Sequence, residues 1–338
     1  MLATKQNTLT FDDLPTSGSV NPVKSDGIFK SRVPMNGMGK NLLDNWYFVG
    51  GGSQLGDGVF PINQRGQTQY SGSGKHFDRW GFGAAGGALE LLASGVKITV
   101  TSGSQSFAQT LSMPNAALYG RTVTVSALTT GGDLYYETGT LPVSAPSSTT
   151  TYISKTIPNA GSLSVLYAAS TSRFTVGIAN SSSSSQSVTI AAMKLEFGTE
   201  QTLCHQANGA WVLNEIPDYG EELRKCQRYM IALTPMTDTY GFIGFALGNN
   251  NAALGADAII SLPTTMIKGS PTVSISGDWI LYDRTVGTSL TITSMDYLRL
   301  TQNALCVIVK ASGVVSGRMY EVMTDNDSTA KLIISCET

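Results

Sequence analysis

The chain is built from short segments in which apolar and polar residues alternate, separated by turns rich in glycine and serine. The period of two is clearest at residues 89–92, 96–100, 122–128, 174–178 and 188–197. Alternation sends successive side chains to opposite faces of a strand, so each segment predicts a strand with one buried face. Turns are marked by the pairs Gly86-Gly87 and Gly131-Gly132 and by the serine run 181–185. Many short strands with such turns are typical of an antiparallel sandwich or jelly roll.

A second set of predicted strands lies at residues 241–247, 258–262, 272–275, 290–293, 305–309, 319–323 and 331–335. We therefore predict a mainly β chain with two antiparallel β-sandwich (jelly-roll-like) domains, joined by a short helix and preceded by an extended arm. The predicted divisions are the arm at 1–40, a first sandwich at 41–217, a connecting helix at 218–235 and a second sandwich at 236–338.

One segment, residues 219–233, has helical spacing. Asp218 is a suitable N-cap, and an acidic pair in the first turn suits the positive end of the helix dipole. Leu223, Cys226, Met230 and Leu233 recur at helical intervals, and Pro235 follows them. We expect this helix to pack one face against a sandwich, as a strut between the two β regions.

Low charge limits the classes of partner. Charged residues make up 14% of the 338 residues and the net charge is −2, against about 25% charged residues in an average soluble protein. Without a basic field to gather phosphates, nucleic acid is not an expected partner. The first residues lack an apolar signal core, and no stretch approaches the roughly 18 apolar residues of a membrane helix, so we expect no membrane insertion.

The four cysteines are Cys204, Cys226, Cys306 and Cys336, and none has a short metal-type spacing. We expect free buried thiols, as in a protein made in a reducing cytoplasm, with a Cys306–Cys336 disulfide as the alternative. His205 with Cys204 and Cys226 offers three zinc ligand types, but the spacing matches no zinc pattern. No metal or cofactor is therefore predicted.

The sequence gives little indication of a set of catalytic residues. His76 and His205 are the only histidines, and we expect both to be structural or surface residues. A glycosidase needs two carboxylates roughly 5–10 Å apart, and acidic residues here lie mostly in turns. We predict that the chain is not an enzyme, and a capsule depolymerase with carboxylates converging between chains is a lesser alternative.

A ligand site is predicted in the second sandwich. Sugar rings stack on aromatic side chains while their hydroxyls bond to polar groups, and this mixture occurs at Tyr240, Asp278, Trp279, Tyr282 and Arg284. The alternative is that Trp279 and Tyr282 are core aromatics of the sandwich.

Four segments carry a family resemblance: Asn41–Phe48 (NLLDNWYF), Ile62–Gly66 (INQRG), Phe77–Trp80 (FDRW) and Tyr219–Tyr229 (YGEELRKCQRY). They resemble a domain that recurs in bacteriophage tail-fibre and receptor-binding proteins, with a sandwich like that of carbohydrate-binding modules. The quoted motifs themselves are expected to be structural.

The resemblance implies a homotrimeric virion appendage, made in the host cytoplasm, whose arm at 1–40 joins other virion proteins. It also implies binding of a host cell-surface polysaccharide during adsorption, by the second sandwich as the tip. A purely structural virion protein, such as a head fibre, decoration or baseplate component without a ligand, is the alternative.

Overall fold

The computed structural model describes residues 39–52, 58–101, 105–111, 118–158, 160–170, 173–235, 239–249, 255–267, 271–301 and 303–337. The predicted mainly β, antiparallel fold is confirmed, because every strand pairing is antiparallel. The predicted arm at 1–40, with its expected contacts to other virion proteins, lies outside the described residues except for its last two positions. Residues 41–338 form one compact unit.

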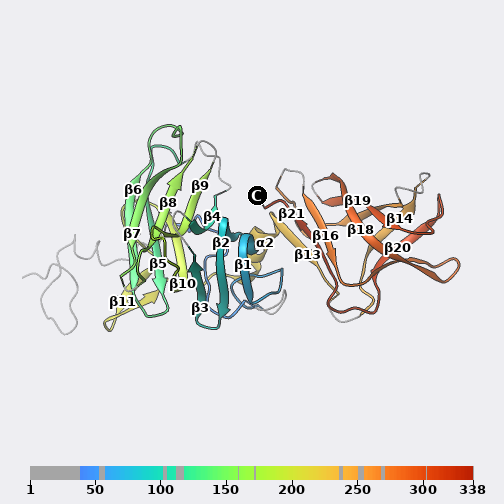
Figure 1. The fold of residues 1–338 in the computed structure, drawn as a ribbon, viewed down its shortest axis with the longest axis horizontal. Helices are drawn as coiled ribbons and strands as arrows, with labels where there is room; N and C mark the ends of the chain where they lie inside the picture. Colours follow the sequence, from blue (N-terminus) through green and yellow to red (C-terminus); the bar gives the residue numbers. More distant parts are fainter. Residues whose placement is uncertain are drawn as a thin grey trace, which may run out of the picture. The chain divides into compact units, whose positions relative to one another are not determined.

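Ten strands form one sheet in the order β6-β5-β10-β3-β2-β4-β9-β8-β7, with β1 paired to β2. The sheet folds over so that its two ends, β6 and β7, lie side by side and β5 faces β8 (Figure 1). The strands are β1 Gln69–Phe77, β2 Trp80–Leu92, β3 Gly95–Val100, β4 Gln105–Thr110, β5 Thr122–Thr129, β6 Leu134–Thr140, β7 Thr150–Thr156, β8 Leu163–Ala169, β9 Phe174–Asn180 and β10 Gln186–Phe197.

Strand β3 shows how the sequence pattern produces this sandwich. Val96, Ile98 and Val100 are fully buried in the first hydrophobic core, whereas Lys97 between them is exposed. Strand β10 differs, since its residues from 190 to 196 are buried on both faces. Beyond Ile190, where the pairing with β3 ends, residues 41–48 pair along the free edge of β10 through Leu42 N–H to Leu195 C=O and Phe48 N–H to Ala191 C=O, both 2.8 Å.

A hairpin, β11 (Cys204–Ala207) and β12 (Ala210–Leu213), follows the sandwich. Its two turn residues, Asn208 and Gly209, have φ of 51° and 80°. Asn-Gly tolerates this left-handed conformation, which matches the twist of a two-residue hairpin.

The predicted helix at 219–233 is wrong beyond Gln227. Helix α2 spans Tyr219–Gln227, and the Asp218 carboxylate caps it by accepting from Glu221 N–H at 2.8 Å. Residues Met230–Leu233 instead form strand β13, which pairs with β21. Met230, Ile231 and Ala232 are all buried, so both faces of this segment are covered and the strand ladder replaces the helical one.

The remaining strands build a second hydrophobic core. Strands β14, β15, β19, β18, β17 and β20 close into a barrel, and β13, β21 and β16 form a three-stranded sheet (Figure 1). All seven segments predicted as strands in this region are strands. An eighth strand, β17, was not predicted. The bounds are β14 Phe242–Gly248, β15 Ala256–Ser261, β16 Thr272–Ser276, β17 Trp279–Asp283, β18 Thr288–Leu300, β19 Ala304–Ala311, β20 Met319–Thr324 and β21 Lys331–Ser335.

Candidate binding surfaces

The structure does not unite the five predicted ligand residues. Trp279 is only 1% exposed and its indole N–H donates to the Ser276 carbonyl at 3.0 Å. Its ring lies in the second core and is not available for stacking on a sugar. The prediction for Trp279 is therefore wrong, because an aromatic residue beside a turn can face inward as readily as outward.

The other four residues fall into two groups. Asp278 and Tyr240 flank the Thr324 end of β20, where Asp278 C=O accepts from Asp325 N–H at 2.9 Å. Tyr282 and Arg284 lie toward the other end of β17, where Arg284 pairs with Glu321 at 2.7 Å. The seven residues from 278 to 284 span about 20 Å in a strand, so no single sugar residue reaches both groups.

The barrel carries an exposed apolar face instead. Five side chains on neighbouring strands are at least half exposed: Phe242, Phe245, Leu247, Ile259 and Met319. In the pairing register Phe245 lies opposite Ile259 and Leu247 opposite Met319, so the five are contiguous. The Phe242 and Phe245 rings meet edge to face at 5.0 Å. We call this set the apolar barrel face, and contiguous apolar surface of this kind is typical of a protein contact.

The four segments that carry the resemblance meet in one buried polar network. Asn45, with φ of 52°, binds Ile62 N–H and the carbonyls of Ile62 and Asp78 through its side chain. Its own N–H donates to the Glu222 carboxylate of α2 at 2.7 Å. Burial raises the pKa of Glu222. The Asn45 carbonyl also accepts from the Trp80 indole N–H at 2.9 Å. One asparagine thus joins all four segments, as a structural role requires.

Gln64 extends the network to β13. Its amide nitrogen donates to Asp78 at 2.6 Å and to Met230 C=O at 2.8 Å, while its oxygen accepts from Ala232 N–H at 3.1 Å. Asp78 is fully buried, and burial, with a contribution from Glu337, raises the pKa of its carboxyl to about 7. All polar atoms of the Gln64 side chain are used within the chain, so this part of the network offers nothing to a ligand.

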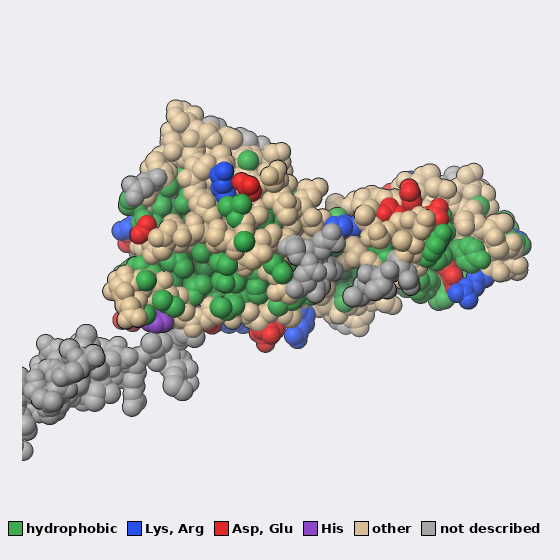
Figure 2. All heavy atoms as spheres, turned by 90° about the horizontal axis from the view of Figure 1, so that it is seen from below, with side chains coloured by type: hydrophobic (Ala, Val, Ile, Leu, Met, Phe, Trp, Pro, Cys, Tyr) green, Lys and Arg blue, Asp and Glu red, His purple; other side chains and the backbone are tan. Residues whose placement is uncertain are grey.

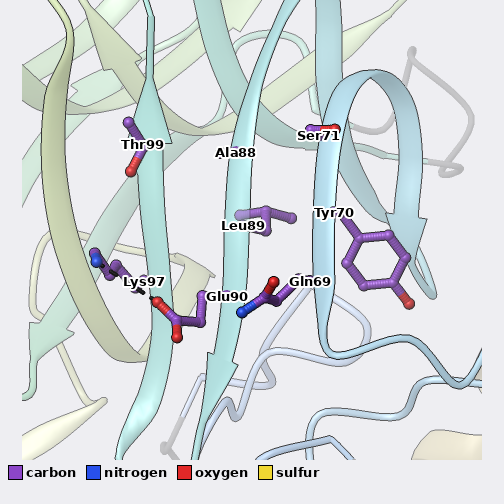
Figure 3. A pocket seen from close by; sticks show the side chains of 8 residues that line it. All are labelled: Gln69, Tyr70, Ser71, Ala88, Leu89, Glu90, Lys97 and Thr99. Atoms are coloured by element: carbon purple, nitrogen blue, oxygen red, sulfur yellow. Dashed lines mark ion pairs between the residues drawn. The ribbon is translucent and has the colours of Figure 1, made fainter.

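A shallow hollow of about 540 Å³ lies on the outer face of β1, β2 and β3. Two rows of side chains cross it: Gln69–Glu90–Lys97 and Ser71–Ala88–Thr99 (Figure 3). We call these six residues the polar hollow. Lys97 Nζ lies 3.5 Å from Glu90 Oε2, so the charges within the hollow cancel. Amide, hydroxyl and paired charged groups can together donate to and accept from a polyhydroxylated ligand.

A second hollow, of about 390 Å³, lies at the junction of β6 and β7. Tyr136 is 44% exposed there, beside the ion pair of Glu137 with Lys155 at 3.5 Å. It combines an aromatic ring with charged groups, which is the mixture that was expected around Trp279.

The histidines and cysteines form no reactive site. His76 is buried and stacks on Tyr70, burial lowers its pKa, and His205 bonds to Asn214 at 2.6 Å. All four cysteines are free, and burial raises the pKa of Cys204 to about 11. Within the described ranges, no group of three or more His, Cys, Asp or Glu side chains is arranged to hold a metal. The one described helix, α2, is also too short and polar to cross a membrane.

The chain matches no protein-family model, no curated protein and no solved structure. Figure 2 shows one face on which charged side chains are sparse and uncharged groups predominate. The polar hollow and the apolar barrel face were not singled out from the sequence. Their residues alternate with buried ones like the outward positions of any strand, and only the pairing register brings them together.

Proposed function

We propose that the chain is a non-enzymatic subunit of a virion appendage that binds a host surface polysaccharide. The observation that supports this best is the polar hollow, which is open, uncharged overall and lined by hydrogen-bonding side chains on three adjacent strands. A polysaccharide presents many hydroxyls, which can donate to and accept from such side chains. The phage character of the proposal rests on the resemblance of the four segments described above.

The proposed mechanism is adsorption by many weak contacts. Gln69, Ser71 and Thr99 exchange hydrogen bonds with sugar hydroxyls, and each such bond contributes about 1 kcal/mol net. A repeating polymer engages several copies at once, and linkage of weak sites raises overall binding by about 10²–10⁴-fold. In this proposal the first sandwich carries the ligand, in place of the second domain that the sequence indicated.

Filling the hollow tests the proposal. Ala88 lies between Ser71 and Thr99 in the register, so Ala88→Tyr places a ring in the hollow. The matched control is Ala210→Tyr, since Ala210 is exposed on β12 away from this surface. Both full-length variants are applied to an array of bacterial surface polysaccharides. We expect Ala88→Tyr to lose at least about 10-fold in binding, the effect of one to two hydrogen bonds, and Ala210→Tyr to bind normally.

The apolar barrel face favours a second candidate, a structural virion subunit that contacts other proteins and has no glycan ligand. If the folded protein binds none of the polysaccharides on the array, that result supports this candidate and excludes the first. Release of new reducing ends from any bound polysaccharide would instead show that the chain is a depolymerase.

A further inference from the structure

A third hollow on the first sandwich has a different chemical character. It lies on the outer face where β1, β2, β4 and β9 adjoin, with a volume of about 380 Å³. In the pairing register Lys75 lies opposite Gly81, Gly81 opposite Ala108, and Ala108 opposite Gly177. Three small residues in a row therefore leave a trough beside one lysine. We call this hollow the lysine trough.

The small residues are required by close backbone contacts. A Cβ atom at Gly81 would lie 2.1 Å from the Gly74 carbonyl oxygen, and one at Gly177 would lie 2.0 Å from the Phe107 carbonyl oxygen. Larger residues cannot occupy these positions without moving a strand. The trough is thus fixed by the packing of the sheet. Its polar walls include the hydroxyl residues Ser106, Thr110 and Thr175.

Two cations line the trough without anions of their own. Among the described residues, no carboxylate lies within ion-pair distance of the Lys75 ammonium or the Arg173 guanidinium. The acidic residue of the lining, Glu337, is already bound by Arg65 Nη2 at 2.8 Å and by Arg79 N–H at 2.6 Å. The trough therefore presents uncompensated positive charge.

The environment of Lys75 agrees with this description. Burial lowers its pKa to about 8, and Arg79, Arg65 and Arg173 add to the effect, whereas Glu337 opposes it. A lysine in such a place is poorly solvated and gains more from an incoming anion than a lysine on the open surface.

We propose that the lysine trough binds an anionic sugar residue, with its acidic group between Lys75 and Arg173. The sugar hydroxyls then meet Ser106, Thr110 and Thr175. This inference rests on the proposed function and specifies the class of polysaccharide as one with acidic repeats. Carboxylate and phosphate ester substituents share the required chemistry.

The test uses the full chain on an array of uronic-acid, phosphate-bearing and neutral bacterial polysaccharides. Each acidic polymer is also presented after chemical reduction of its carboxyls or removal of its phosphates. We expect binding to weaken about 10- to 100-fold when the acidic group is lost, which is the effect of losing one hydrogen bond to a charged group. Loss on carboxyl reduction or on dephosphorylation identifies which acidic group is recognised.

Variants connect the effect to the trough. Lys75→Gln and Arg173→Gln should bind the acidic polymer and its neutral derivative equally. Lys310→Gln is the matched control, since Lys310 is an exposed lysine on β19 that pairs with Asp296 and lies outside both hollows, and it should keep the preference for acidic polymers. Arg173 is exposed, so Arg173→Gln is expected to fold normally even where Lys75→Gln does not.

A pH series separates a binding role of Lys75 from a structural one. Lys75 loses its charge as pH rises above about 8, so the preference for acid should decline between pH 8 and 9 in the unmodified chain. Lys75→Arg stays charged and should keep the preference throughout. If the chain binds polysaccharides but the binding depends neither on their acidic groups nor on Lys75, this inference is overturned and the proposed function stays intact. Binding of no polymer would overturn both.

Discussion

The guanidinium carbon of Arg79 lies 3.4 Å from the centroid of the Tyr229 ring. This contact joins a turn of the first sandwich, where Arg79 has φ of 73°, to a residue that lies two positions beyond the end of α2. The guanidinium also bonds to Asp44 at 3.2 Å and to Thr110 C=O at 2.9 Å, and Arg79 is only 4% exposed.

Arg79→Met should therefore lower the free energy of unfolding by about 2–4 kcal/mol, because it removes a buried cation–π contact and charged hydrogen bonds. Urea denaturation measures this. Arg121→Met is the control, since exposed Arg121 lies over Phe197 at 5.6 Å, and its effect should stay below about 1 kcal/mol. Equal losses of unfolding free energy in the two variants would mean that the buried Arg79 contact does not stabilise the fold more than the exposed Arg121 contact.

Asp78 should make stability depend on pH. Burial raises its pKa from 3.8 to about 7 in the folded chain, so the folded state holds a proton that the unfolded state has released. Stability is then fully present below about pH 4 and declines as pH rises to about 7, by about 1.4 kcal/mol per pH unit at most. Asp78→Asn should flatten this decline between pH 5 and 7 in urea titrations. An unchanged slope would exclude Asp78 as its source.

Lys194 is a fully buried cation in β10. Its ammonium bonds to Thr202 Oγ1 at 2.8 Å and lies 3.6 Å from both Glu196 and Glu215. Lys194→Met leaves the buried Glu196 uncompensated, which should cost about 3–5 kcal/mol.

Addition of Glu196→Gln to that variant should recover most of the loss, because the amide oxygen still accepts from Thr202 N–H. The surface control is Lys155→Met, whose partner Glu137 is 45% exposed, and its cost should be below about 1 kcal/mol. If the double variant is as unstable as Lys194→Met alone, the loss of stability does not come from an uncompensated charge on Glu196.

Asp218→Ala removes the N-cap of α2. The loss of the bond to Glu221 N–H should lower the free energy of unfolding by about 1 kcal/mol, and Asp218→Asn or Asp218→Ser should restore most of it. Thermal unfolding of the three variants measures the effect. Equal stability of alanine and serine at this position would contradict a capping role.

The apolar barrel face should govern self-association. Ile259 is 65% exposed, so Ile259→Lys should change stability by less than about 0.5 kcal/mol while it reduces the fraction of larger species in sedimentation velocity. Val143→Lys is the control, because Val143 is 87% exposed on the first sandwich. Identical sedimentation of both variants and the parent chain would mean that the face does not mediate self-association.

The sequence predicted the fold class, half of the ten strands of the first sandwich and most strands of the second core, because period-two alternation directly reflects a sheet with one buried face. It did not predict β1, β4, β6, β7 or β8 in the first sandwich, nor β11, β12, β13 and β17. Glycine in β1 and threonine in β7 weaken the alternation there. The end of α2 was also missed, since Met230 and Leu233 fit a helical interval and the competing contact, with β21, is about 100 residues away.

The binding surfaces depended on that same long-range information. Lys75 and Arg173 are almost 100 positions apart and meet only because β1, β2, β4 and β9 are neighbours in the sheet. Trp279 illustrates the opposite case, in which a suggestive local sequence does not reveal which face of its strand is buried.

The pairing of β13 with β21 places Met230 opposite Ser335, and this has a consequence during synthesis on the ribosome. All ten strands of the first sandwich precede β13, so that domain can fold while later residues are still being added. Strand β13 must wait for β21, about 100 residues later, which at about 5–20 residues per second takes on the order of 5–20 s. During that interval Ile231 and its apolar neighbours remain uncovered, so we expect chaperones to engage the nascent chain at this segment first.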